Sequence, residues 1–163
     1  MFSVGIITSS DKGFAGERED LSGKLIKQLV EELGYEVKQY IILPDDGDTL
    51  SKEMIRMADE LNVDLILTTG GTGFSKRDVT PEATLAVCDK MASGIAEAIR
   101  AYSISITPRG MLSRAVSGIR GSTLIINMPG SPKAVQEVMD YIMDSVRHGL
   151  EILTGSGAEC ARK

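Results

Sequence analysis

One continuous apolar segment followed by a run of glycines constrains the fold of this chain more than any other feature. Residues 64–69 (Asp-Leu-Ile-Leu-Thr-Thr) predict a central parallel strand, because such strands are buried on both faces. Three glycines follow within four positions, at Gly70, Gly71 and Gly73, and glycine contributes no side chain to packing. Thr80-Pro81 then predicts a helix that is capped by the threonine and has the proline at its first position. The segment therefore predicts a strand, a turn that exposes backbone amides, and a helix.

The side chains beside this turn indicate what it binds. Lys76, Arg77 and Asp78 add two cations and a carboxylate next to the glycines. Glycine-rich turns between a strand and a helix hold phosphates in α/β proteins, so the segment predicts a nucleotide or phosphoester site with Asp78 as a candidate metal ligand. It matches neither the P-loop pattern nor the dinucleotide-binding pattern. The alternative is a turn that binds nothing, because turns of this composition are common in α/β folds.

Composition narrows the class of protein. The chain has 163 residues, of which 42% are apolar and 25% are charged, and this predicts a globular protein. We expect a single domain over residues 1–155 and a flexible tail over residues 156–163. The net charge of −5 argues against a nucleic-acid partner, which requires a basic surface. The sequence contains neither a signal peptide nor an apolar run of about 18 residues, so we expect a cytoplasmic protein with no membrane segment.

The two cysteines do not indicate a metal centre or a disulfide. Cys88 and Cys160 are far apart and form no Cys-x-x-Cys pair. We interpret Cys88 as a small apolar core residue and Cys160 as a residue of the tail.

Strand and helix signals alternate along the chain, which predicts an α/β fold with a mostly parallel sheet. The expected strands are residues 3–8, 37–43, 64–69, 115–119 and 122–128. The expected helices are residues 21–33, 49–61, a segment starting at 80–81, a segment around 95–102, and a last helix over residues 132–150 that is capped by Ser131.

The loops that follow the parallel strands are the expected location of a ligand. In open parallel sheets, ligands bind outside the carboxyl ends of the strands. Four loops leave such ends here, namely residues 9–13, 44–48, 70–75 and 129–133. All four are rich in glycine, serine or aspartate, so we expect them to converge on one site.

The acidic residues of these loops suggest a magnesium ion. Asp46 and Asp78 are expected on two neighbouring strand-end loops, where they could share a metal, since Mg²⁺ is usually held by one or two carboxylates together with substrate phosphates. Asp48 or Thr49 is interpreted as the cap of the following helix, and Asp45 as a solvated turn residue.

The last strand-end loop suggests an anion pocket. Ser131 heads a helix whose free amides and dipole favour an anion by roughly 0.3–1 kcal/mol per charge. Lys133 adds a positive charge, and Ser113, Arg114 and Arg120 are expected to reach the same area. The alternative for Ser131 is a simple helix cap.

The sequence argues against covalent catalysis by the protein. The single histidine, His148, falls on the last predicted helix, away from the loops, and no Gly-x-Ser-x-Gly motif is present. The chemistry that fits is phosphoryl or nucleotidyl transfer, in which a substrate carries the nucleophile and the protein positions and neutralises charge.

Nearly the whole chain resembles the MogA/MoaB family of molybdenum cofactor biosynthesis proteins. The matching motifs are Ser10-Asp11, residues 16–23, Leu43-Pro44-Asp45-Asp46, residues 69–73, residues 78–84, residues 97–100, residues 111–114, residues 118–121 and residues 127–133. The resemblance implies a three-layer α/β/α fold and a homotrimer. It also implies molybdopterin adenylyltransferase activity, in which ATP and molybdopterin react with Mg²⁺ to give adenylated molybdopterin and pyrophosphate.

The resemblance also implies roles for individual residues. The catalytic and metal-binding aspartates fall on Asp46 and Asp78, and the nucleotide phosphates fall on the glycine loop, which comprises Gly70, Gly71, Thr72, Gly73 and Ser75. The pterin side falls on Ser113, Arg114, Pro129, Gly130 and Ser131, and the matching motifs add Ser10, Asp11 and Glu97 as binding residues. Which pocket takes the adenosine and which takes the pterin stays open.

Two other functions fit the same loops. One is a non-catalytic pterin-binding or carrier protein, which would not need Asp46 and Asp78. The other is a scaffold or interaction trimer. The sequence shows no second domain, so molybdate insertion is expected to reside in another protein that this one contacts transiently.

Overall fold

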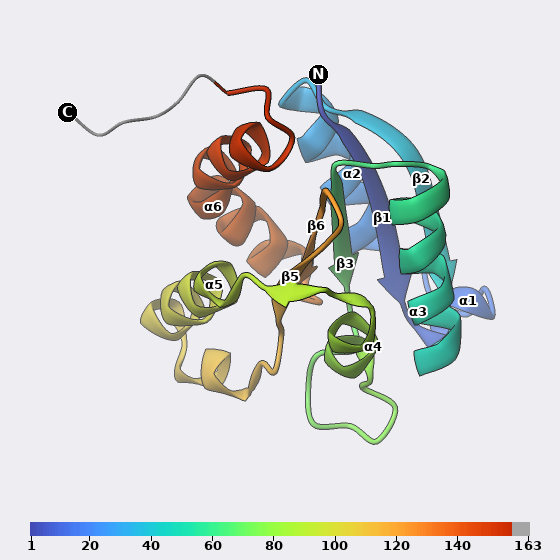
Figure 1. Cartoon of the computed structure of the whole chain (residues 1–163). Helices are drawn as coiled ribbons and strands as arrows, with labels where there is room; N and C mark the ends of the chain where they lie inside the picture. The colour runs from blue at the N-terminus through green and yellow to red at the C-terminus, as the bar shows by residue number, and fades with distance from the viewer. Residues whose placement is uncertain (158–163) are drawn as a thin grey trace.

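The computed structural model describes residues 1–157, which form one six-stranded sheet with helices on both faces (Figure 1). The strands are β1 (Ser3–Ser9), β2 (Glu36–Leu43), β3 (Leu65–Thr69), β4 (Lys90–Met91), β5 (Ser117–Arg120) and β6 (Thr123–Met128). The α-helices are α1 (Asp11–Phe14), α2 (Leu21–Glu32), α3 (Gly47–Ile55), α4 (Thr80–Val87), α5 (Ser93–Ile106) and α6 (Pro132–Leu153). A π-helical turn, η1 (Arg56–Glu60), extends α3, and a 3₁₀ segment, η2 (Pro108–Leu112), follows α5.

The sheet is mostly parallel, as the sequence predicts. Its strand order is β2-β1-β3-β6-β5-β4, and β2, β1, β3 and β6 run parallel. In this register Val4 lies opposite Leu65, and Leu65 lies opposite Leu124. The carboxyl ends of these four strands therefore meet at one edge. The strands β5 and β4 are antiparallel to their neighbours and close the other side of the sheet.

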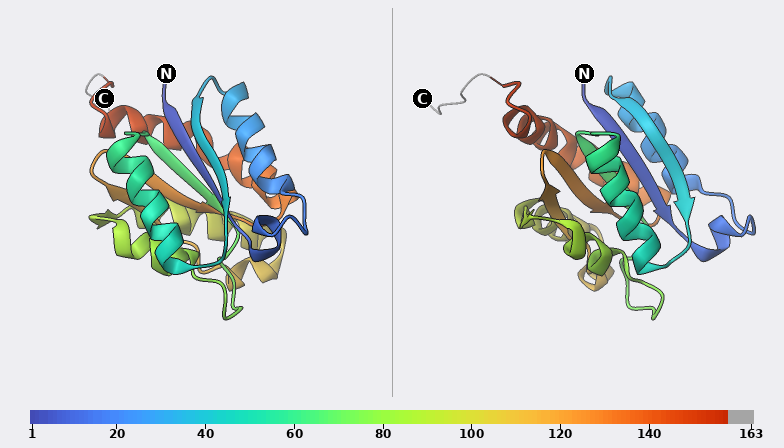
Figure 2. Two further views of the ribbon diagram at one scale, coloured as in Figure 1. Left: turned by 90° about the vertical axis from the view of Figure 1, so that its right-hand side faces the viewer. Right: turned by 45° about the vertical axis from the view of Figure 1, so that its right-hand side comes forward.

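The two faces of the sheet have separate cores, because successive residues of a strand point to opposite faces. Leu65 and Leu67 of β3 join the core under α2, α5 and α6, whereas Ile66 joins the core under α3 and α4. Figure 2 shows the sheet between these two helical layers. The expected α/β/α arrangement is therefore confirmed.

Two helix starts differ from the sequence predictions by one or two residues. The helix expected from Thr49 begins at Gly47, and its cap is Asp46 rather than Asp48 or Thr49. The helix expected to be capped by Thr80 includes Thr80 as its first residue. At α3 the cap is set by the hydrogen bond from the Thr49 amide to the Asp46 side chain, which several neighbouring side chains have the chemistry to make, whereas at α4 the residue before Thr80, Val79, makes no side-chain capping bond.

The strand expected at residues 115–119 is β5, which begins only at Ser117. The amide of Val116 donates to the Asn127 side chain at 3.1 Å, and the Val116 carbonyl accepts from the Asn127 amide at the same distance. A side chain from the partner strand thus takes the place of the regular ladder at this point.

Several further expectations concern the ends and the cysteines. Within residues 1–157, no helix combines the length and apolarity needed to cross a membrane. Residues 158–163, with Cys160, lie outside the described part, so the expected tail and the domain limits stay predictions. Cys88 is only partly buried at the margin of the core under α3 and α4, and burial raises the pKa of its thiol to about 11.

Candidate active site

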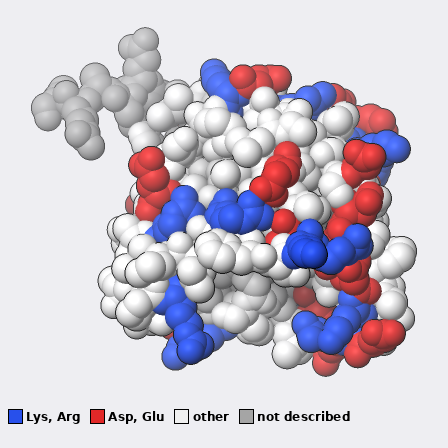
Figure 3. Space-filling view, turned by 90° about the horizontal axis from the view of Figure 1, so that it is seen from below, with Lys and Arg blue, Asp and Glu red and all other residues white. Residues whose placement is uncertain are grey.

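The loops after β1, β2, β3 and β6 converge on one cleft at the carboxyl edge of the sheet. The cleft has a volume of about 490 Å³ and is lined from these loops by Ser10, Asp45, Gly70 and Gly130. The convergence that the sequence predicts is therefore confirmed. Figure 3 views the molecule from this edge, where charged side chains of both signs gather toward the right of the view.

The glycine loop lines the cleft and lies so close to the end of β1 that residues with a Cβ atom would not fit there. Gly70 has φ +87°, and a Cβ atom there would lie 2.3 Å from the Ser9 carbonyl oxygen. Gly71 has φ +70°, and its Cβ would lie 2.3 Å from Thr80 Oγ1. Glycine has no Cβ and therefore tolerates positive φ together with such a close backbone approach. Thr80 Oγ1 donates to the Gly70 carbonyl at 3.0 Å and so fixes the turn to the start of α4.

The loop between Thr72 and Asp78 is held by Arg114. Its Nε donates to the Gly73 carbonyl at 2.7 Å, its Nη2 donates to the Asp78 carbonyl at 2.8 Å, and its guanidinium also pairs with Glu82. That pair holds the pKa of Glu82 below its usual range. In this structure the Arg114 guanidinium therefore supports the loop that carries Asp78.

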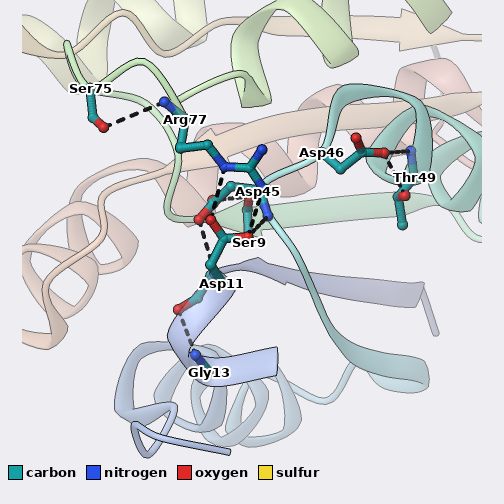
Figure 4. Close-up of polar contacts among 9 residues, drawn as sticks. Ser9, Asp11, Gly13, Asp45, Asp46, Thr49, Ser75 and Arg77 are labelled. Atoms are coloured by element: carbon teal, nitrogen blue, oxygen red, sulfur yellow. Dashed lines mark hydrogen bonds and ion pairs between the residues drawn. The ribbon is translucent and has the colours of Figure 1, made fainter. Parts of the chain in front are cut away.

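A second clamp joins the same loop to the ends of β1 and β2 (Figure 4). Arg77 donates from Nε to Asp11 Oδ2 at 3.0 Å and from Nη2 to Asp11 Oδ1 at 2.9 Å. Asp11 and Asp45 each accept the backbone amide of the other, at 3.0 and 2.9 Å, and Ser9 Oγ donates to Asp45 Oδ1 at 2.6 Å. Hydrogen bonding to Arg77 holds the pKa of Asp11 below its usual value. Asp45 is thus a structural link at the cleft and not a solvated turn residue.

Asp46 and Asp78 each follow a residue of this clamp in the chain, and of the two only Asp78 lines the cleft. Asp46 Oδ2 caps α3 by accepting from the Thr49 amide at 2.9 Å and from Thr49 Oγ1 at 2.6 Å, and these bonds lower its pKa. Asp78 Oδ2 accepts from the Ser75 amide at 3.0 Å and lines the cleft. The strands that lead to these two residues are not adjacent in the sheet, because β1 lies between β2 and β3, and a metal shared by Asp46 and Asp78 stays a prediction.

The donor chemistry of these two aspartates fits Mg²⁺ as a partial site. Within residues 1–157, the second oxygen of each carboxylate accepts no hydrogen bond, and hard carboxylate oxygens are what Mg²⁺ prefers. The same part of the chain holds no cluster of three or more His, Cys, Asp or Glu side chains suited to a metal. The protein thus provides at most a few ligands, and Mg²⁺ bound with substrate phosphates typically takes few from the protein.

A buried aspartate that the sequence analysis did not select also lines the cleft. Asp20 is 9% exposed and accepts from Thr8 Oγ1 at 2.6 Å, from the Gly23 amide at 2.9 Å and from the Tyr40 hydroxyl. Burial and this bond raise the pKa of Tyr40. Its position in the sequence, directly before the apolar pattern of a helix, could have identified Asp20 as the cap of α2. Arg18 also lines the cleft and was not selected.

A smaller cavity adjoins the cleft. It has a volume of about 250 Å³, and both cavities are lined by Gly130. Of the residues that the resemblance places on the pterin side, Ser113, Pro129 and Gly130 line it, whereas Arg114 and Ser131 do not. Thr72 of the glycine loop also lies in its wall. Arg100 shapes the wall by donating from Nη1 to the Ser113 and Ala115 carbonyls, at 2.9 and 3.2 Å.

The structure does not bring every expected residue to these cavities. Arg120 is the clearest correction, because β5 runs antiparallel and carries it to the opposite edge of the sheet, where it pairs with Asp59 at 2.6 Å. Glu97 is exposed on α5 and lines neither cavity. Ser131 caps α6 by accepting from the Ala134 amide at 3.3 Å, which agrees with the simpler alternative. His148 lies near Glu151 on α6, and no histidine lines the cleft.

Comparisons with known proteins agree with this geometry. Residues 5–148 match the family model described as a probable molybdopterin binding domain. The chain is 40% identical to molybdopterin adenylyltransferase of Helicobacter pylori strain J99, over 94% of this chain and 88% of the relative. It is 35% identical to the Escherichia coli K12 protein of the same name, over 90% of this chain and 78% of the relative.

The fold has a solved counterpart. The molybdopterin biosynthesis enzyme MoaB from Thermus thermophilus superposes with a TM-score of 0.89 at 44% identity, over 95% of this chain and 98% of that chain. A family model that spans most of the chain, relatives aligned over most of their length and a shared fold lead to one conclusion. This chain belongs to the molybdopterin-binding domain family of molybdenum cofactor biosynthesis proteins.

Proposed function

We propose that this protein is a molybdopterin adenylyltransferase, which transfers AMP from ATP to the phosphate of molybdopterin and releases pyrophosphate. The observation that carries the proposal is the pair of cavities that meet at Gly130, one lined by the glycine loop and Asp78 and the other by Ser113 and Pro129. Two adjoining cavities suit a reaction between two bound substrates. The curated relatives that align over most of this chain carry the same activity in their names.

The reaction does not require a nucleophile from the protein. A phosphate oxygen of molybdopterin attacks the α-phosphorus of ATP, a new P–O bond forms there, and the bond to the bridging oxygen breaks as pyrophosphate leaves with the electron pair. Catalysis then rests on positioning and on neutralising charge. Bound Mg²⁺ supplies neutralisation of the phosphate charge, and Asp46 and Asp78 would hold it.

The chain's own residues keep the two substrates aligned. Gly70 and Gly71 line the cleft, and without side chains of their own they offer their backbone to a phosphate. Arg114 and the Arg77–Asp11 pair fix the loop that carries Asp78, so that its carboxylate is held in place before substrate binds. Such preorganisation avoids reorganisation during the reaction.

A direct assay tests the proposal. The wild-type protein is incubated with molybdopterin, ATP and Mg²⁺, and adenylated pterin and pyrophosphate are quantified by chromatography. Formation of both products in equal amounts supports the transferase, and absence of product across a range of magnesium concentrations overturns it. Tight pterin binding without ATP consumption would identify a carrier. A melting temperature that responds to neither ligand would identify a scaffold.

We also propose a homotrimer. The support is a set of exposed apolar side chains on α5 and η2, where Ile104, Ile106, Met111 and Leu112 are 40%, 48%, 59% and 48% exposed. Large exposed apolar side chains that lie together are typical of protein–protein contacts. Light scattering after size-exclusion chromatography should give three times the chain mass of 17.5 kDa, and Met111→Asp with Leu112→Asp should lower it. A single-chain mass for the wild type would exclude the trimer.

The remaining expectations concern the setting of the reaction. We place it in the cytoplasm, where ATP is supplied, and we expect the product to pass to a molybdenum-insertion protein by transient contact. Cell fractionation tests the first expectation. Faster product transfer to a purified insertion protein than to bulk solution tests the second.

A further inference from the structure

A groove between α2 and α6 is separate from the candidate active site. It has a volume of about 420 Å³ and shares no lining residue with the two cavities described above. Figure 2 shows α2 and α6 on the same side of the sheet, and the two helices contact each other directly. Nothing in the proposed reaction uses this groove.

The groove follows one continuous stripe of α6. Its α6 residues are Gln136, Met139, Asp140, Met143, Asp144 and Arg147, which are spaced by three or four positions. Residues at this spacing lie on one face of a helix. Gln136 and Arg147 are eleven positions apart, which corresponds to roughly 16 Å along the helix axis. A groove of this length, between two helices, has the dimensions of about three turns of a third helix.

The floor of the groove is apolar but contains one unpaired polar group. Met139 and Met143 are 3% and 5% exposed, and methionine adapts its shape to a partner more readily than branched side chains do. Tyr35, also in the lining, is 8% exposed, and its hydroxyl makes no hydrogen bond within residues 1–157. The same part of the chain contains no fully enclosed side-chain oxygen that lacks a partner, so the hydroxyl reaches the open space of the groove. The hydroxyl is therefore open to water in the free protein and is available to hydrogen-bond a ligand in the groove.

The rim of the groove is acidic. Glu32, Asp140 and Asp144 are exposed on it, and Arg147, the one basic residue that residues 1–157 contribute to the lining, lies 3.5 Å from Glu151. A surface with three carboxylates around an apolar floor is complementary to an apolar face flanked by lysine or arginine.

We propose that the groove binds a basic amphipathic helix of a partner protein, with the apolar side chains of that helix against Met139 and Met143 and its cations facing Asp140 and Asp144. The Tyr35 hydroxyl contributes a hydrogen bond to the bound segment. Binding through an apolar helical face laid into a groove is a recurring mode of peptide recognition. The groove is a docking surface independent of turnover, because it touches none of the residues assigned to the reaction.

The test uses methionine methyl groups as local probes. The probe ligand is a synthetic helical peptide of about three turns with leucines spaced by three and four positions and lysines beside them. Titration into protein labelled with ¹³C at the methionine methyls should shift the signals of Met139 and Met143 to saturation. The signals of Met54 and Met57, which lie in the core under α3 and α4, should not move.

Charge variants test the acidic rim. The double variant Asp140→Asn with Asp144→Asn should bind the peptide about tenfold more weakly, a difference of about 1.4 kcal/mol. Tyr35→Phe should weaken binding by about fivefold, which corresponds to one hydrogen bond. The control, Asp48→Asn with Glu60→Gln, removes the same charge from exposed positions elsewhere and should bind like the wild type. All of these variants should keep the adenylyltransferase rate of the wild type, so a failure here is distinct from a failure of the proposed activity.

Four results would overturn the proposal. One is the absence of shifts at Met139 and Met143 at millimolar peptide. A second is equal binding of a peptide with glutamate at every lysine position, and a third is an equal loss of binding in the rim and control variants. The fourth is a shift of the same two methyl signals with protein concentration alone, because a second copy of this chain would then occupy the groove.

Discussion

The guanidinium of Arg77 lies in two-point contact with the carboxylate of Asp11, with Nε–Oδ2 and Nη2–Oδ1 distances of 3.0 and 2.9 Å. The two residues are 66 positions apart and join the loop after β3 to the short helix after β1. Both side chains are exposed, and exposed ion pairs add little to folding stability. We therefore infer that the main effect of this contact is to position the next residue, Asp78.

Replacing Asp11 with asparagine should separate the effect of this contact on the position of Asp78 from its effect on folding stability. The folded pKa of Asp11 lies below its ordinary value of 3.8, so its stabilising contribution is present above that pH and is lost as pH falls through the folded pKa. The melting temperature of the wild type should therefore exceed that of Asp11→Asn slightly at neutral pH, and the two should converge in acid. Turnover at neutral pH should fall much more than stability does.

Asp59→Asn is the matched control for this variant. Asp59 pairs with Arg120 at the opposite edge of the sheet, and this pair also lowers its pKa. It should therefore show a similar convergence in acid without losing turnover. Equal turnover in Asp11→Asn and Asp59→Asn would contradict the positioning role of Asp11.

Two substitutions of Asp46 should separate its capping role from its charge. Asparagine is as good a helix cap as aspartate, whereas alanine in its place costs about 1 kcal/mol of stability. We expect Asp46→Asn to keep the wild-type free energy of unfolding and to lose turnover, and Asp46→Ala to lose both. Denaturant titration and the adenylylation assay measure the two effects. If Asp46→Asn turns over like the wild type, the carboxylate has no role beyond the cap.

Gly71→Ala should destabilise the protein by roughly 1–3 kcal/mol. The new Cβ would lie 2.3 Å from Thr80 Oγ1, and the φ of +70° is strained for alanine. In a Thr80→Ala background the 2.3 Å clash disappears and contacts of 3.2 Å to Ser9 Oγ and 3.3 Å to the Cβ of residue 80 remain, so the two effects should not add. Gly149→Ala is the control, because nothing lies within 4 Å of its added Cβ and alanine favours the helix by about 0.5–1 kcal/mol. Urea titrations of the four variants decide whether the glycine loop is held as tightly as the geometry indicates.

Asn127→Ala should destabilise the protein on the order of 1–3 kcal/mol, because it leaves buried groups unpaired. The Asn127 side chain is 1% exposed, accepts from the Val116 amide, and donates to Thr68 Oγ1 at 3.0 Å and to Thr84 Oγ1 at 2.9 Å. It thereby ties β3, β6 and α4 together behind the glycine loop. Calorimetry should show a lower melting temperature, while Asn62→Gly, at an exposed turn with φ 51°, should change it little. Similar melting temperatures for the two variants would argue against this network.

The sequence predicted the sheet and the location of the cleft well, for a physical reason. Apolar runs such as residues 64–69 are compatible only with strands buried on both faces, and parallel strands put their following loops at one edge. The convergence of Ser10, Gly70 and Gly130 on one cleft follows from these local signals. The resemblance to a known family added the identity of the substrates, which no local pattern specifies.

By itself, then, the sequence determined the α/β class, the order of the main elements and which four loops meet. Only the tertiary structure decided that Arg120 points away from the site, since the antiparallel course of β5 depends on its pairing with β6. It also decided that Asp46 caps α3 and that Asp20 is buried against Tyr40, twenty residues away. Hydrophobic periodicity is a property of neighbouring residues and can be read along the chain. The partner of a charged or polar side chain is chosen from every residue that the fold brings near it.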